Sequence, residues 1–172
     1  MNSREQIPDS DLGTAEGRPT ILFVVDNSAT MLDALRNDPG RRKMSVVRDL
    51  IRIYIEETIG QADFGLIVFG GWDDGYGCEA VRTLVKPSDI DRECFLTKIA
   101  DLPTPRGRTP SIMAVEEAAK ELERSDSVYR TIVLISDGID TCSDSDIENE
   151  NERERKVIDR VRALLARIRD NT

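Results

Sequence analysis

Short runs of apolar residues alternate along this chain with longer segments in which apolar residues recur every three or four positions. Runs of the first kind predict β-strands, which we place at 21–25, 62–70, 80–85 and 129–138. Segments of the second kind predict amphipathic helices, which we place at 44–59, 89–100, 111–124 and, after an acidic stretch at 143–155, around Val157 to Ile168. This alternation is typical of an α/β domain with a mostly parallel sheet.

The runs ILFVV and TIVLI are almost entirely apolar and do not alternate between apolar and polar residues. Such continuous apolar runs are typical of central parallel strands that are covered on both faces. Only a hairpin-length loop separates the strand at 62–70 from the one at 80–85, so we expect these two to be antiparallel. The expected fold is therefore a doubly wound, mostly parallel sheet with one antiparallel edge strand and helices on both faces.

The helix at 44–59 and the loop residues add detail to this expectation. The apolar residues with helical spacing, which we expect on its buried face, are Val47, Leu50, Ile51, Tyr54 and Ile55. Thr109 followed by Pro110 is typical of a helix start in which the threonine caps the first turn. Trp72 and Tyr76 form either an exposed recognition patch or a cover over the sheet edge, and we favour the cover.

Residues 1–19 are polar, contain glycine and proline, and show no periodicity, so we expect a flexible leader followed by one domain at 20–172. No apolar stretch reaches the length of a membrane helix. The apolar centre of a secretory signal is not visible either, which favours a cytoplasmic location. A disulfide would instead favour export, so we leave the compartment open.

Charge and composition exclude several classes of partner and of catalytic or metal site. The net charge of −9 disfavours nucleic acid as a partner and suits cations or basic surfaces. The chain has no histidine, which excludes histidine-based catalytic triads and histidine-liganded zinc. None of the cysteines forms a C-x-x-C pair, so a zinc or thioredoxin-type site is not expected. We expect Cys94 to be a small buried residue rather than a reactive thiol.

The two most central strands both end in acidic residues, Asp26 in one case and Ser136-Asp137 in the other. The carboxyl ends of parallel strands share one edge of the sheet, where ligands bind. Two carboxylates brought together there repel unless one takes up a proton or a cation lies between them. Hydroxyl groups of Ser28, Thr30 and Thr109 would complete an oxygen-only set, which suits a hard divalent ion such as Mg²⁺. Taken alone, Asp-x-Ser after a strand is more typical of a capped turn.

Three short motifs carry a resemblance to a known family. D-N-S-A-T at 26–30, G-R-T-P at 107–110 and S-D-G at 136–138 resemble, in order and spacing, the loops of the metal-ion-dependent adhesion site (MIDAS) of von Willebrand factor A domains. Thr30 stands where the family usually has serine and keeps the hydroxyl. The resemblance implies Mg²⁺ as the ion, with Mn²⁺ or Ca²⁺ as alternatives. The metal-binding residues that it implies are Asp26, Ser28, Thr30, Thr109 and Asp137, the two aspartates binding directly or through water.

The resemblance covers roughly residues 20–142 and implies a Rossmann-like fold. GCEAVRTLV and SDGIDTCSD look similar to a bacterial subgroup with cysteines at the places of Cys78 and Cys142, which implies a disulfide if the protein is exported. Similar domains continue with two more strand–helix units, so the last part of the fold is apparently missing here. We expect Asp140 and Thr141, after the third motif, to be solvated.

The resemblance implies a binding module rather than an enzyme, in which the site Mg²⁺ accepts an Asp or Glu carboxylate of a protein partner. The module would belong to a larger protein or complex. An alternative is a Mg²⁺-dependent phosphoryl-transfer hydrolase with Asp26 as nucleophile, although Ser28 stands where such enzymes carry a second carboxylate. A further alternative is a regulatory domain in which the acidic stretch at 143–155 is an intramolecular ligand of the site.

Overall fold

The computed structural model describes residues 18–58, 60–72, 77–87, 92–138 and 140–142, together with isolated positions between 152 and 166. The expected leader lies outside this part of the chain except for residues 18 and 19, and so does Tyr76. The acidic stretch and the apolar face of the last helix also lie largely outside it. Within the described residues, no helix is long and apolar enough to cross a membrane.

The observed elements follow the predicted ones closely. The strands are β1 (Thr20–Asn27), β2 (Ala34–Leu35), β3 (Asp38–Arg42), β4 (Asp63–Gly70), β5 (Val81–Val85) and β6 (Arg130–Ile135). The helices are η1 (Ala29–Leu32), a short 3₁₀ turn, and α1 (Lys43–Thr58), α2 (Arg92–Ala100) and α3 (Ser111–Glu123). Sequence analysis did not predict η1, β2 and β3, because these short polar elements have no hydrophobic periodicity.

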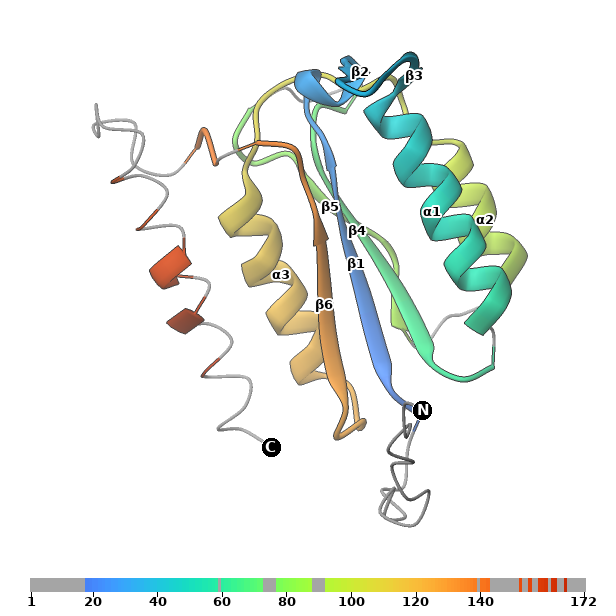
Figure 1. The fold of residues 1–172 in the computed structure, drawn as a ribbon. Helices are drawn as coiled ribbons and strands as arrows, with labels where there is room; N and C mark the ends of the chain where they lie inside the picture. Colours follow the sequence, from blue (N-terminus) through green and yellow to red (C-terminus); the bar gives the residue numbers. More distant parts are fainter. Residues whose placement is uncertain are drawn as a thin grey trace, which may run out of the picture.

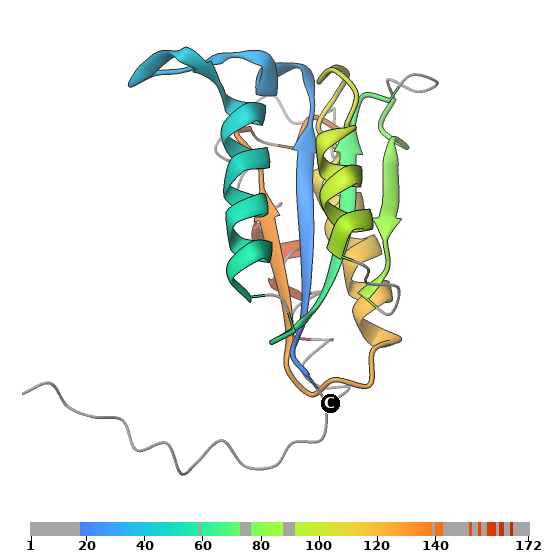
Figure 2. The ribbon, with the colours of Figure 1, turned by 90° about the vertical axis from the view of Figure 1, so that its right-hand side faces the viewer.

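The main sheet has the strand order β5-β4-β1-β6. β1 pairs in parallel with both β4 and β6, and β5 is antiparallel to β4, which confirms the expected arrangement. Helices α1 and α2 lie on one face of the sheet and α3 on the other (Figure 1). In a view turned by 90°, β5 is the outermost strand on one side of the sheet (Figure 2). η1 lies at the carboxyl end of β1, and β2 and β3 lie over the start of α1 (Figures 1 and 2).

The side chains of β1 alternate between the two faces of the sheet, and both faces are buried. Phe23 and Val25 belong to the larger apolar cluster beneath α1 and α2. Leu22 and Val24 belong to a smaller cluster beneath α3. This two-sided burial is the reason why β1 reads as a continuous apolar run.

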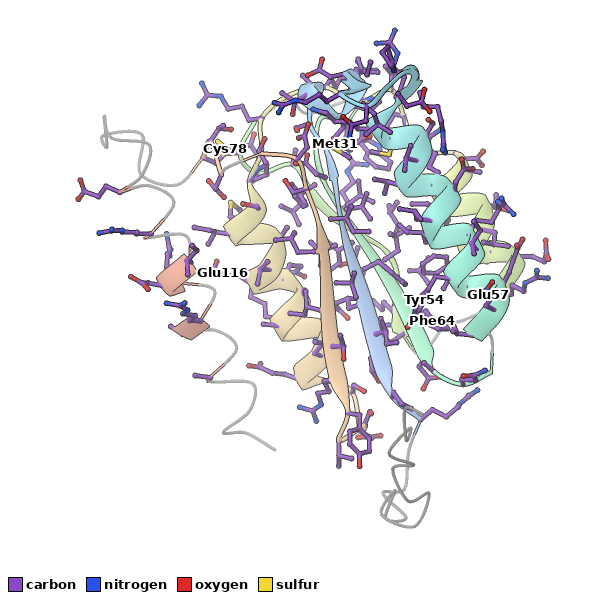
Figure 3. All side chains as sticks on the ribbon, viewed as in Figure 1. Met31, Tyr54, Glu57, Phe64, Cys78 and Glu116 are labelled. Carbon is purple, nitrogen blue, oxygen red and sulfur yellow. A yellow bond between two sulfur atoms is a disulfide. The ribbon has the colours of Figure 1, made fainter. Side chains whose placement is uncertain are left out.

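Aromatic side chains fill the larger cluster. Tyr54 of α1 and Phe64 of β4 point toward one another (Figure 3), with ring centroids 6.1 Å apart and an edge-to-face geometry. Trp72 also packs against this cluster, and the guanidinium of Arg82 lies 4.8 Å from the centre of its ring. The expectation that Trp72 covers the sheet edge is therefore confirmed.

Four expectations about burial are wrong. Tyr54 was expected on the buried face of α1 but is 42% exposed, although its ring contacts Phe64. Leu50 points away from the core and is 59% exposed, because the buried stripe of α1 runs through Met44, Val47, Ile51 and Ile55 instead. Among the described residues, β6 pairs only with β1, and Leu134 is 43% exposed, so this strand is an edge rather than a fully covered centre. Cys94 is an exposed free cysteine on α2.

Candidate metal centre

Asp26 lies at the carboxyl end of β1 and is fully buried. Its Oδ1 accepts a 2.7 Å hydrogen bond from the backbone N–H of Ser28, an Asx-turn that shapes the first loop. Its Oδ2 accepts a 2.6 Å hydrogen bond from the hydroxyl of Ser136, in the loop after β6. The parallel pairing of β1 with β6 therefore brings the first and third motifs together at one edge, as expected.

A chain of side-chain oxygens continues from this point toward Asp137. The hydroxyls of Ser28 and Thr30 lie 3.2 Å apart. The Thr30 hydroxyl donates a 2.8 Å hydrogen bond to Oδ1 of Asp137. Hydrogen bonds thus link four of the five predicted site residues. They join two loops that are far apart in the sequence, since Asp26 and Ser136 are separated by 110 positions.

Thr109, the fifth predicted site residue, reaches the same loops through its backbone. The backbone N–H of Ala29 donates to the carbonyl of Gly107 at 3.4 Å, which seats the second motif beside the first. The N–H of Thr109 donates to the hydroxyl of Thr141 at 2.9 Å, and the N–H of Thr141 donates back to the carbonyl of Thr109 at 3.1 Å. Among the described residues, no hydrogen bond joins the Thr109 hydroxyl to the other four side chains.

Asp140 anchors the start of α3, which corrects two expectations. Its Oδ2 accepts hydrogen bonds from the backbone N–H of Ile112 at 2.8 Å and from the hydroxyl of Ser111 at 3.1 Å. Thr109 makes no capping bond, because Pro110 rather than Thr109 is the residue that precedes the first residue of α3, Ser111. Asp140 is only 1% exposed rather than solvated, and its negative charge suits the positive end of the helix dipole. Thr141 is exposed, as expected, and its hydroxyl also accepts the hydrogen bond from Thr109 of the second motif.

A disulfide links Cys78 to Cys142, with Cα atoms 5.4 Å apart. It ties the loop before β5 to the residues that follow Asp140, and Cys78 lies at the end of the sheet that carries the site (Figure 3). The pairing implied by the resemblance is therefore confirmed. It does not support the cytoplasmic location, because disulfides persist mainly in oxidising compartments.

Glycines at the end of β4 let the loop after β1 and the loop before α3 approach this strand closely. Gly70 has a φ of 103°, which favours glycine, and a Cβ at this position would lie 2.6 Å from the backbone nitrogen of Ser28. A Cβ on Gly71 would lie 2.3 Å from the carbonyl oxygen of Arg106. The amide of Asn27 donates to the carbonyl of Gly71 at 3.0 Å and completes this contact. The glycines therefore hold the first and second motifs against β4.

Lys43 is a residue of the site that sequence analysis missed. Its ammonium group donates to Oδ2 of Asp137 and, at 3.2 Å, to the carbonyl of Thr30. The β2–β3 hairpin makes this contact possible, because it returns the chain from η1 to Lys43, the first residue of α1. Lys43 lies 13 residues after Thr30, and no motif or periodicity in the sequence pointed to it.

The electrostatics of the site favour a positive charge near the two aspartates. Burial raises the pKa of Asp26, the negative charge of Asp137 raises it further, and the hydrogen bonds from Ser136 and Ser28 oppose this rise. The hydrogen bond to Asp137 raises the pKa of Lys43. Ionised Asp26 is therefore costly in this environment unless a cation compensates its charge.

The donor groups are all oxygens, two carboxylates and three hydroxyls, which fit a hard ion such as Mg²⁺ better than a soft metal. Among the residues that the structure describes, no three or more aspartate, glutamate, cysteine or histidine side chains form a group of the kind that binds metals. A metal at this edge would therefore depend on the hydroxyl groups as much as on the carboxylates. The role of the five residues as ligands remains a prediction.

Comparisons with known proteins agree with the fold. Similar solved structures include the pilus adhesin SpaC from Lactobacillus rhamnosus GG in an open conformation (17% identity, TM-score 0.55, 73% of this chain and 15% of that chain). Two others are the PilB minor pilin from Streptococcus sanguinis (20%, 0.58, 72% and 30%) and a von Willebrand factor type A protein from Catenulispora acidiphila (16%, 0.56, 84% and 30%). At these identities the likeness shows the fold alone.

This chain spans less than a third of the length of each of these three structures. No curated protein matches the sequence. The sequence profile of the von Willebrand factor type A domain matches residues 21–139, which include all three motifs and more than half of the chain. The chain therefore belongs to the von Willebrand factor type A domain family.

Proposed function

We propose that this domain is a divalent-cation-dependent protein-binding module and not an enzyme. The residues that would hold the ion are Asp26, Ser28, Thr30, Thr109 and Asp137. When bound, Mg²⁺ would supply a Lewis-acidic coordination position for an Asp or Glu carboxylate of the partner, and Mn²⁺ or Ca²⁺ could take its place.

The observation that carries this proposal is the connected set of oxygens at the edge of the sheet. Ser28 and Thr30 place their hydroxyls 3.2 Å apart, and Thr30 bonds Asp137 across the gap between two strands. Because these hydroxyls are neutral, the two carboxylates are the only charged ligands in the set that compensate the charge of a divalent ion. Such a site leaves the ion able to attract a further carboxylate from outside.

The partner and the compartment are part of the same proposal. The titles of two similar structures describe a pilus adhesin and a minor pilin. Together with the Cys78–Cys142 disulfide, this supports an exported domain within a larger protein that binds another protein. The acidic composition supports a partner other than nucleic acid.

The geometry gives little support to phosphoryl transfer by Asp26. A nucleophile has to reach its substrate, whereas the Asp26 side chain is fully buried. Both of its oxygens accept hydrogen bonds, from Ser28 and from Ser136. The remaining alternative, an intramolecular ligand within 143–155, falls on residues that are mostly outside the described part of the chain.

Calorimetric titration with Mn²⁺ and Mg²⁺ tests the proposal. We expect wild type to bind one ion and Asp26→Asn to lose measurable binding. Asp126→Asn is the matched control. It removes the same charge from an exposed residue that precedes β6, whereas the site follows the carboxyl ends of β1 and β6. Equal binding by wild type and Asp26→Asn would refute the metal site.

A second titration tests the carboxylate-binding step. With Mg²⁺ present, acetate should shift the NMR amide signals of residues 28–30 and 137–138, and with EDTA in place of Mg²⁺ it should not. Acetate shifts that are the same with Mg²⁺ and with EDTA would show that the domain does not use an ion to bind carboxylates.

A further inference from the structure

Lys43 is held at the candidate metal centre by several contacts. Its backbone N–H donates to the carbonyl of Asp33 at 3.0 Å, and it is the first residue of α1. Its side chain is 27% exposed and extends to Oδ2 of Asp137 and to the carbonyl of Thr30. The ammonium group therefore lies against two of the segments that would bind the ion.

Both carboxylate oxygens of Asp137 already have partners. Oδ1 accepts from the Thr30 hydroxyl at 2.8 Å, and Oδ2 accepts from Lys43. The Asp137 side chain is 14% exposed, so water screens the ion pair only partly. Two cations bound to one carboxylate oxygen would repel each other strongly in such surroundings.

Lys43 also has an alternative partner within reach. Oδ2 of Asp33 lies 3.6 Å from its ammonium group, and Asp33 is largely exposed. A rotation of the lysine side chain toward Asp33 and solvent would free Oδ2 of Asp137 without a change in the backbone. The charge of Lys43 would remain paired after this rotation.

From these contacts we propose that Lys43 is a built-in competitor of the divalent cation. Its ammonium group and the ion compete for Oδ2 of Asp137, and Lys43 turns toward Asp33 when the ion binds. Lys43 thereby lowers the metal affinity of the site and keeps Asp137 paired when the ion leaves. This inference rests on the proposed function, and it concerns the occupancy of the site rather than its ligands.

Mn²⁺ titration by calorimetry of three lysine variants tests this proposal. Lys43→Met keeps much of the length and the apolar stem but removes the charge, and we expect it to bind Mn²⁺ about tenfold more tightly or better. Lys43→Arg keeps the charge and should stay within a few-fold of wild type. Lys98→Met, on the exposed face of α2, makes the same change in net charge away from the site and should leave the affinity unchanged.

Thermal unfolding in EDTA and in Mn²⁺ gives a second readout. Lys43→Met should unfold at a lower temperature than wild type in EDTA, because Oδ2 of Asp137 loses its partner, and should gain more stability than wild type when Mn²⁺ is added. Should Lys43→Met fail to fold, Lys43→Gln takes its place in both measurements.

The outcomes separate this inference from the proposed function. Absence of Mn²⁺ binding in wild type and in every variant would refute the metal site itself. Binding by wild type that is equal or weaker in Lys43→Met would refute competition by Lys43 and leave the metal site standing. A gain in Lys98→Met as large as in Lys43→Met would show that only the net charge matters, and this too would overturn the inference.

Discussion

The hydroxyl of Thr30 donates a 2.8 Å hydrogen bond to Oδ1 of Asp137, a residue 107 positions later in the chain. This single contact joins the first and third motifs of the candidate metal centre. It also shows that threonine, at a place where the family usually has serine, directs its hydroxyl toward the other site residues.

Thr30→Val should weaken Mn²⁺ binding by roughly tenfold to a hundredfold, since valine keeps the shape of threonine but has no oxygen. Thr30→Ser should bind within a few-fold of wild type, because it keeps the hydroxyl. Calorimetric titration measures both, with circular dichroism to confirm that each variant is folded. Equal affinity in Thr30→Val and wild type would show that residue 30 is not a ligand.

Asp26 should make the stability of the metal-free domain depend on pH. Burial raises the pKa of Asp26 above its ordinary value of 3.8, so the folded state holds its proton more tightly than the unfolded state does. The free energy of unfolding therefore falls as the pH rises from 3.8 through the raised pKa. Urea unfolding in EDTA between about pH 4 and pH 7 should show this fall in wild type and a flatter profile in Asp26→Asn.

The control for this pH experiment is Asp126→Asn, which should keep the wild-type slope because Asp126 is exposed. Parallel profiles of wild type and Asp26→Asn would mean that burial of Asp26 does not determine the pH dependence.

Asp140→Ala should lower the free energy of unfolding by about 2 kcal/mol, because it removes the acceptor for the first turn of α3 and for the N–H of Cys142. Ser111→Ala removes only one of these hydrogen bonds and should cost less. Denaturant unfolding measures both. A smaller effect for Asp140→Ala than for Ser111→Ala would contradict the assignment of Asp140 as the anchor of the helix.

Replacing Cys78 and Cys142 together by serine should lower the free energy of unfolding by about 4 kcal/mol on the loop-entropy estimate, because the disulfide closes a loop with a sequence separation of 64. Wild type treated with a reductant should behave in the same way. Cys94→Ser, at the exposed free cysteine, is the control and should leave stability nearly unchanged. Insensitivity of wild type to the reductant would argue against a structural role of the disulfide.

Gly70→Ala should destabilise the fold by about 2 kcal/mol or more, because the new methyl group would meet the backbone of Ser28 at a positive φ. Gly60→Ala also places alanine at a positive φ, 83°, but nothing lies within 4 Å of its Cβ. The comparison separates backbone strain from the steric clash. Similar losses in the two variants, measured by thermal unfolding, would mean that the approach of the loops at Gly70 is not tight.

Much of the fold could be predicted from the sequence because its causes are local. The continuous apolar run of β1 follows from burial on both faces, and the hairpin-length loop before β5 fixes the antiparallel direction of that strand. Asp26 and Asp137 were expected at one edge because parallel strands end on the same side of a sheet. The hydrogen bonds through Ser28, Thr30 and Ser136 bear out this proximity.

Burial of individual residues could be predicted less well. Leu50 has the same helical spacing as its buried neighbours, but whether a flanking position is covered depends on what packs against the helix. The same holds for Leu134, which belongs to an apolar run on a strand that is an edge among the described residues. Periodicity identifies the element and its general face, and packing decides the width of the buried stripe.

The sequence by itself determined the order of the four strands of the main sheet and of helices α1 to α3, and the positions of the three motifs, since both depend on short-range patterns. Only the tertiary structure placed Lys43 on Asp137 and Asp140 at the start of α3. The reason is physical. These contacts join segments whose separation along the chain carries no periodic signal, and they depend on the path of the β2–β3 hairpin and of the loop after β6.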